Sequence, residues 1–100
     1  MKYMSACPGI TGEAAEWLAD KGCVVIGADQ FDVDVVPAQS PDEELAVHAL
    51  CLADRGIYLI ENLDLERLAA DRVYEFLFVC LPLKFVGATG SPVRPIAVAP

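Results

Sequence analysis

Apolar and polar positions fall into blocks along the chain, and these blocks predict helices that alternate with strands. Residues 11–21 predict an amphipathic helix that Thr11 caps and Gly22 ends. Its expected apolar face comprises Ala14, Trp17 and Leu18. Residues 23–28 then form an unbroken apolar run of strand length, which is typical of a strand covered on both faces.

A second helix is predicted after a loop at residues 30–39. Residues 40–43, Ser-Pro-Asp-Glu, form a capping box with proline at the first helical position, and the helix is expected to run to about Arg55. Two neighbouring apolar faces cover most of it: Leu45, His48, Ala49 and Leu52 on one, and Val47, Leu50 and Cys51 on the other. We therefore expect His48 to point into the protein or into an interface.

Residues 57–60 predict another buried strand, which Glu61 closes on the side of Ile57 and Leu59. The remaining chain predicts a helical turn at 65–70 capped by Asp64, strands at 74–83 and 94–97, and a turn-rich connection at 87–92. Helices that alternate with apolar strands indicate an α/β fold with a mixed sheet and flanking helices.

Three side chains able to bind a metal are candidates for a site. Ligands in such folds usually lie beyond the carboxyl ends of strands. Asp29 and Glu61 follow predicted strands, and His48 is on an inward helix face. Each has a structural alternative. A lone histidine on an apolar face is commonly a hydrogen-bonded core residue, and Asp29 or Asp34 can bond its own backbone in a turn. The buried Glu61 needs a partner, and the alternatives to a metal are salt bridges to Arg55, Arg67 or Arg94.

Composition narrows the classes of partner. With 55% hydrophobic residues in 100, the chain carries more apolar surface than one small domain can bury, so we expect other protein to cover it. The net charge of −8 argues against nucleic acid and anionic lipid. No apolar run approaches a membrane span, and a start without signal-peptide features favours the cytoplasm.

Other chemistries find little support. The four cysteines are scattered without a C-x-x-C pair, so neither a disulfide nor a cysteine zinc site is predicted. Cys51 lies three positions after His48, but no orienting partner supports a nucleophile there. The glycine-rich residues 87–91 lack the phosphate-loop order and a following helix, so they predict a turn.

Five short motifs occur in the same order and spacing as in a known family. They are Pro8-Gly9-Ile10-Thr11, Gly27-Ala28-Asp29 with Asp34, His48 followed by Glu61-Asn62-Leu63, Leu81-Pro82-Leu83-Lys84, and Gly90-Ser91-Pro92-Val93-Arg94. Together they resemble the C-terminal half of the metal-dependent cyclase family, which includes bacterial kynurenine formamidases and isatin hydrolases. The resemblance covers residues 7–97, so the whole chain, residues 1–100, is expected to be one partial domain.

The resemblance implies part of a swivelling β/β/α domain whose N-terminal half is absent. It implies that His48 and Glu61 are metal ligands and catalytic residues for zinc or manganese, acting through a metal-activated water on a formamide or cyclic amide. Such an arylformamidase-like activity belongs to tryptophan catabolism. Residues 29–32 (Asp29, Gln30, Phe31 and Asp32) correspond to a substrate-side loop, where Gln30, Phe31 and Asp32 depart from the usual family residues.

The family's other ligands come from a His-x-Gly-Thr-His-x-Asp-x-Pro-x-His run that this chain, with its single histidine, lacks. We therefore expect an incomplete site that is inactive alone and needs a partner chain with the N-terminal half, or a homo-oligomer. The alternative is a non-catalytic oligomerising or interaction module derived from the same fold.

Overall fold

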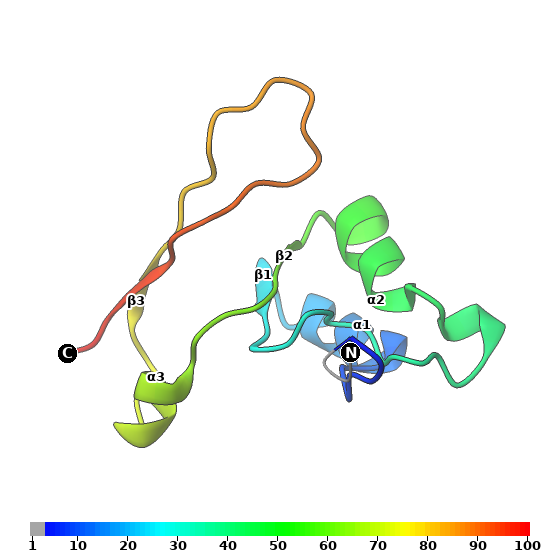
Figure 1. The fold of residues 1–100 in the computed structure, drawn as a ribbon, viewed down its shortest axis with the longest axis horizontal. Coiled ribbons are helices and arrows are strands. Elements are labelled where there is room, and N and C mark those ends of the chain that lie inside the picture. The colour runs from blue at the N-terminus through cyan, green and yellow to red at the C-terminus, as the bar shows by residue number, and fades with distance from the viewer. Residues whose placement is uncertain (1–3) are drawn as a thin grey trace. The chain divides into compact units, whose positions relative to one another are not determined.

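The structure is a computed structural model that describes residues 4–100. The contacts within the chain group into two units, Met1–Asp64 and Leu65–Pro100 (Figure 1). The first unit contains α1 (Gly12–Asp20), β1 (Val25–Gly27), η1 (Pro41–Glu43), α2 (Ala46–His48), η2 (Ala49–Arg55) and β2 (Tyr58–Ile60). The second contains α3 (Glu66–Ala70), β3 (Leu77–Val79) and β4 (Ile96–Val98). The predicted combination of helices and strands is confirmed.

Helix α1 begins and ends where its sequence predicts. The Thr11 side chain accepts a hydrogen bond from the Ala14 N–H at 3.2 Å, and Gly22 follows the helix with a φ of +81°. The predicted apolar face is wrong, however, because Ala15 is fully buried whereas Trp17 is 60% exposed. The helix packs through its small residues, since these allow a close approach to the neighbouring helix: a Cβ at Gly12 would lie 3.4 Å from that of Ala46.

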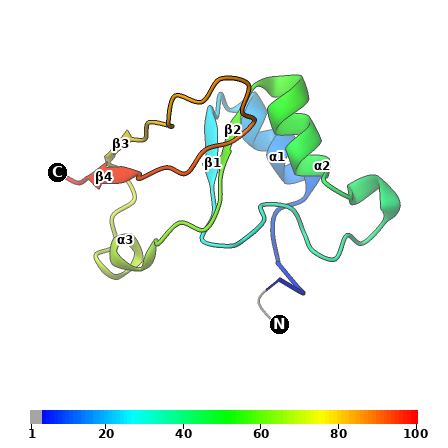
Figure 2. The same ribbon diagram turned by 45° about the horizontal axis from the view of Figure 1, so that its top comes forward.

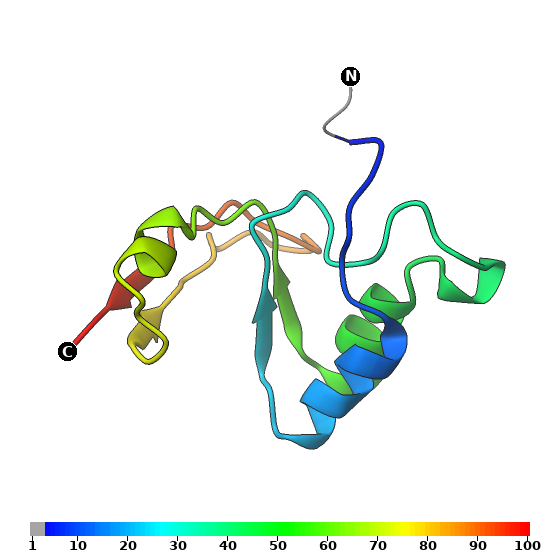
Figure 3. The ribbon, with the colours of Figure 1, turned by 90° about the horizontal axis from the view of Figure 1, so that it is seen from below.

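Strands β1 and β2 form a parallel pair in which Ile26 lies opposite Leu59. Figures 2 and 3 show both α1 and α2 on the same side of this pair. Tyr58 in β2 and Val24 just before β1 are both more than 70% exposed. The prediction of strands covered on both faces is therefore wrong for this unit, because its helices cover a single face.

The helix predicted from the capping box to Arg55 is broken. A 3₁₀ turn, η1, occupies the predicted start, and the Ser40 side chain makes no capping hydrogen bond. Leu45 then adopts a left-handed φ of +55°, and helical structure resumes at α2 and continues as the π-helix η2. Leu45 and Leu52 are both more than half exposed, so the expectation that little of this helix faces water is also wrong.

The second unit is built on an antiparallel pair, in which Phe78 of β3 lies opposite Ala97 of β4. The Ser91 hydroxyl accepts a hydrogen bond from the Leu83 N–H at 2.9 Å. Both strands are shorter than predicted or shifted from the predicted range, and the N-cap of α3 is Leu65 rather than Asp64. Within residues 4–100 the strands form two separate two-stranded sheets, so the predicted single mixed sheet is wrong.

The core lies entirely in the first unit. It comprises Ala15, Val33, Val47, Cys51 and Ile57. No residue from 65 to 100 is buried. All four cysteines carry free thiols, as their spacing predicts. Within residues 4–100, every helix falls short of the length and apolarity that crossing a membrane requires.

Candidate metal centre

Asp34 supplies the cap that the predicted capping box does not. Its Oδ1 accepts the Val47 N–H at 2.8 Å, and its Oδ2 accepts the His48 N–H at 3.2 Å. These are two of the backbone donors that a helix start leaves without intrahelical partners. The Asp34 side chain is buried, so the first turn of α2 is held by a residue from the distant loop after β1.

The same carboxylate orients the His48 ring. His48 Nδ1 lies 2.6 Å from Asp34 Oδ2. A carboxylate that already receives N–H donors acts as an acceptor, so Nδ1 donates the hydrogen bond to Asp34. In a neutral ring with this hydrogen bond, the lone pair would be on Nε2, at the other edge of the ring.

Glu61 lies beside that edge. Its Oε1 is 3.6 Å from His48 Nε2, and the Val33 N–H donates to the same oxygen at 3.1 Å. Glu61 directly follows β2. Two of the predicted arginine partners pair elsewhere, Arg55 with Glu16 and Arg67 with Asp71.

Residues 32–34 connect these groups. Asp32 Oδ1 accepts the Asp34 N–H at 2.9 Å, so Asp32 has the backbone-turn role that the sequence left open for Asp34. The Val33 carbonyl accepts the Ile10 N–H at 2.8 Å. A Cβ at Gly9 would lie 2.2 Å from Asp34 backbone atoms, and Gly9 has a φ of +43°. Only glycine permits this contact without a backbone shift.

The predicted substrate-side loop divides into parts with different surroundings. Asp32 lies at the His48 ring, with its Oδ1 3.9 Å from Nδ1. Gln30 faces the other way: its side chain accepts the Cys7 thiol, and its carbonyl accepts the Asn62 N–H at 2.8 Å. Phe31 is half-buried, and Asp29 is exposed. The structure thus brings Asp32 and Asp34, rather than Asp29, to His48 and Glu61.

We tested whether these side chains fit a metal ion. Ligand atoms of Asp32, Asp34 and His48 lie within 4.8 Å of one another, so proximity alone would select this trio. Three N–H groups, however, already occupy the oxygens of Asp34. His48 Nε2 and Glu61 Oε1 are the better donor pair, because two ligands of one tetrahedral zinc ion lie about 3.4 Å apart. The donors fit part of a metal site.

Cys51 does not join this chemistry. Its side chain is fully buried in the core. Burial raises the pKa of the Cys51 thiol, and the neighbouring Cys23 and Asp34 raise it further. A thiol that stays protonated is a poor nucleophile and a poor metal ligand, which agrees with the sequence-based rejection of a cysteine nucleophile.

Sequence reasoning missed the part played by Asp34. The signal was a carboxylate between Val33 and Val35, in a stretch otherwise apolar enough to be buried. A buried carboxylate must collect hydrogen bonds, and a helix start offers free backbone N–H groups. The capping box at residues 40–43 instead led to the prediction that a local residue caps this helix.

Comparison with known proteins supports the predicted family. The model of the Cyclase family, described as "Putative cyclase", matches residues 1–35. The kynurenine formamidases of Bacillus cereus and Bacillus cytotoxicus are 36% and 38% identical to this chain over 95 residues. Cyclase-like protein 2 of Arabidopsis thaliana is 31% identical over 90 residues.

The predicted resemblance to the cyclase family is confirmed. The alignments with the Bacillus enzymes cover 95% of this chain but 42% of each relative, and the Arabidopsis alignment covers 90% and 30%. The chain therefore spans about two fifths of the length of the Bacillus relatives and less than a third of the Arabidopsis one. No solved structure matches it.

Proposed function

We propose that this chain carries part of the active site of a metal-dependent hydrolase of the cyclase family, acting on a formamide or a cyclic amide. His48 and Glu61 are its metal ligands. The observation that carries the proposal is the pairing of His48 Nε2 with Glu61 Oε1 at 3.6 Å while Nδ1 is held by Asp34. The names of the Bacillus relatives support an aryl formamide as the substrate.

His48, Glu61 and Asp32 have different roles in the proposed reaction. A bound zinc or manganese ion supplies a Lewis acid that polarises a carbonyl and activates water near neutral pH. His48 offers Nε2 to that ion and is kept in place by Asp34. Glu61 keeps Oε1 on the Val33 N–H, so its second oxygen can take a proton during attack on the amide. Asp32, beside His48, is the residue of the 29–32 loop placed to contact substrate.

The site is incomplete in this proposal. Two ligands hold a divalent ion weakly, and the sequence contains no second histidine. We propose that the missing ligands come from another polypeptide, which also covers exposed apolar side chains. The Bacillus cereus relative contains further sequence beyond the part that this chain matches.

Zinc titration by calorimetry tests the ligand pair. The chain should bind one zinc ion weakly, His48→Ala should abolish binding, and Glu61→Gln should weaken it by about tenfold or more. Glu13→Gln is the matched control, because Glu13 is an exposed carboxylate on α1. Zinc binding that survives His48→Ala would contradict the proposal.

Hydrolysis of N-formylkynurenine tests the incompleteness. The purified chain should show no turnover. Activity should appear when it is mixed with the part of the Bacillus cereus relative that it does not match. The same mixture with the His48→Ala chain should stay inactive. Efficient turnover by the chain alone would show that it needs no partner for catalysis.

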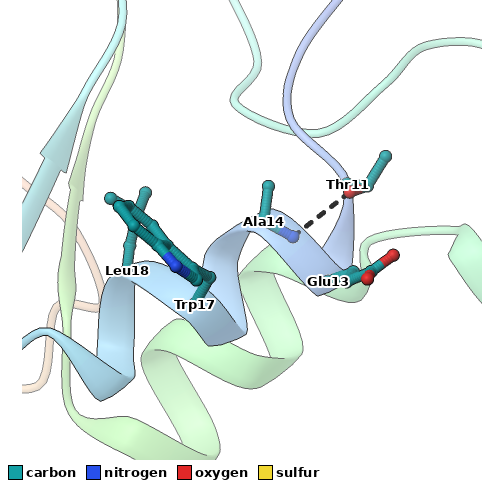
Figure 4. A pocket seen from close by; sticks show the side chains of 5 residues that line it. All are labelled: Thr11, Glu13, Ala14, Trp17 and Leu18. Carbon is teal, nitrogen blue, oxygen red and sulfur yellow. Dashed lines mark hydrogen bonds between the residues drawn. The ribbon is translucent and has the colours of Figure 1, made fainter.

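A second candidate function is a non-catalytic module that self-associates, and the exposed face of α1 favours it. Figure 4 shows Ala14, Trp17 and Leu18 along α1. With Thr11 and Glu13 they line an open pocket of about 510 Å³. The lysine Nζ of Lys21 lies 5.5 Å from the centre of the Trp17 ring. Under this alternative, Trp17→Glu would dissociate an oligomer in sedimentation, whereas combined His48→Ala and Glu61→Ala changes would leave both the oligomer and its response to zinc unchanged.

A further inference from the structure

We propose that Asp34 is a positioning residue that fixes the tautomer of His48, so that the lone pair on Nε2 is directed to the Glu61 side before any ion arrives. The tautomer itself follows from the geometry of this chain alone. Its consequence for metal affinity rests on the proposed function.

The Asp34 carboxylate is surrounded by hydrogen-bond donors. Two backbone N–H groups, those of Val47 and His48, donate to the two carboxylate oxygens. His48 Nδ1 approaches Oδ2 at 2.6 Å, and the Asp34 side chain is buried whereas that of His48 is 29% exposed. With the opposite tautomer, the lone pair of Nδ1 would face a carboxylate lone pair at this distance. That repulsion is strong where little water screens it.

Asp34 also couples the start of α2 to the His48 ring. One carboxylate caps the first turn of α2 and holds the side chain that this turn carries. Any movement of Asp34 therefore shifts the backbone at His48 and its ring together. Gly9 packs directly against the Asp34 backbone, because a Cβ added at Gly9 would overlap the Asp34 backbone atoms. The ring is held by the fold rather than by its own rotamer preference.

Asp34 and Asp32 differ in their contacts with His48. Asp32 has the same charge, and its Oδ1 is 3.9 Å from His48 Nδ1, beyond hydrogen-bonding distance. That oxygen accepts the Asp34 N–H at 2.9 Å instead. An effect of negative charge alone would involve both carboxylates. An effect of the hydrogen bond would involve Asp34 alone.

Nitrogen-15 spectroscopy of labelled histidine tests the inference without ambiguity, because His48 is the single histidine of the chain. At alkaline pH, where imidazoles are neutral, the wild-type spectrum should show a protonated Nδ1 and an unprotonated Nε2. Asp34→Leu keeps a side chain of similar size but removes the acceptor that faces Nδ1. The proton should then move to Nε2, and zinc affinity should fall by about 10- to 100-fold.

Asp32→Asn is the matched control, since it removes the same charge and keeps an oxygen for the Asp34 N–H. It should retain the wild-type tautomer and a zinc affinity within about threefold of wild type. A wild-type spectrum with the proton on Nε2 would overturn the inference, and so would an Asp34→Leu spectrum identical to wild type. The wild-type spectrum decides the tautomer even if Asp34→Leu does not fold, which circular dichroism would reveal. A tautomer change without zinc binding to the wild-type chain would uphold the positioning role and refute the proposed metal site.

Discussion

The two units of this chain differ in how much of their structure their own residues can stabilise. The unit Met1–Asp64 contains every buried residue among positions 4–100, together with His48 and Glu61. The unit Leu65–Pro100 contains no buried residue. Charge divides as unevenly, since only three of the 15 acidic residues, Glu66, Asp71 and Glu75, fall after position 64. The acidic first unit is the one with a core and with candidate chemistry.

The second unit teaches what an apolar sequence does without a core to enter. Its two-stranded ribbon is of a kind that is marginally stable in water on its own. Its exposed large apolar residues are Tyr74, Phe76, Leu77, Phe78, Val79, Leu81, Leu83, Phe85, Val86, Val93, Ile96 and Val98. Such a surface is typical of a region that further protein covers, which supports the proposed partner chain.

The largest expected contrast between the units comes from their glycines. Gly9→Ala should destabilise the first unit by about 3 kcal/mol or more, because φ is positive and the new Cβ would overlap the Asp34 backbone. Gly90→Ala in the second unit should change stability by less than about 0.5 kcal/mol, because its Cβ would meet open space. Urea unfolding monitored by far-ultraviolet circular dichroism, to which both units contribute, measures both. Equal effects would show that Gly9 is not closely packed on the loop.

A smaller contrast is expected for two valines. Val47→Ala should cost about 2 kcal/mol, because Val47 is fully buried and its truncation leaves a cavity. Val79→Ala should cost less than about 1 kcal/mol, because Val79 is 40% exposed. The same urea titration compares them. A cost at Val79 as large as that at Val47 would mean that the second unit is covered in solution, for example by self-association, which repeating the titration at lower protein concentration would reveal.

The smallest expected effect concerns pH and the Cys51 thiol. Because burial raises its pKa above the ordinary 9.0, the folded state holds the thiol proton more tightly than the unfolded chain does. This contribution to stability is complete below the ordinary pKa and is lost as pH rises through the raised one. Stability should therefore fall less steeply above about pH 9 in Cys51→Ala than in wild type. Parallel slopes in urea titrations at several pH values would contradict burial of this thiol.

Local signals predicted part of the fold well. Thr11 and Gly22 bound a helix through contacts within a few residues, so their roles are readable from the sequence. The apolar runs predicted strands near β1 and β2. Errors occurred where a distant partner decided the outcome. Asp34 rather than Ser40 accepts the capping hydrogen bond, and the smaller Ala15 rather than Trp17 is buried on α1.

The sequence by itself determined the residue types of the candidate site and their order, and with them the resemblance to the cyclase family. His48 and Glu61 were identifiable because a lone histidine and a strand-closing carboxylate occurred in that family's spacing. Only the tertiary structure brought Asp34 and Asp32 to His48, since the loop after β1 folds back over the start of α2. The physical reason is that a buried carboxylate needs hydrogen-bond donors, and the closest free ones belonged to a helix 13 residues further along the chain.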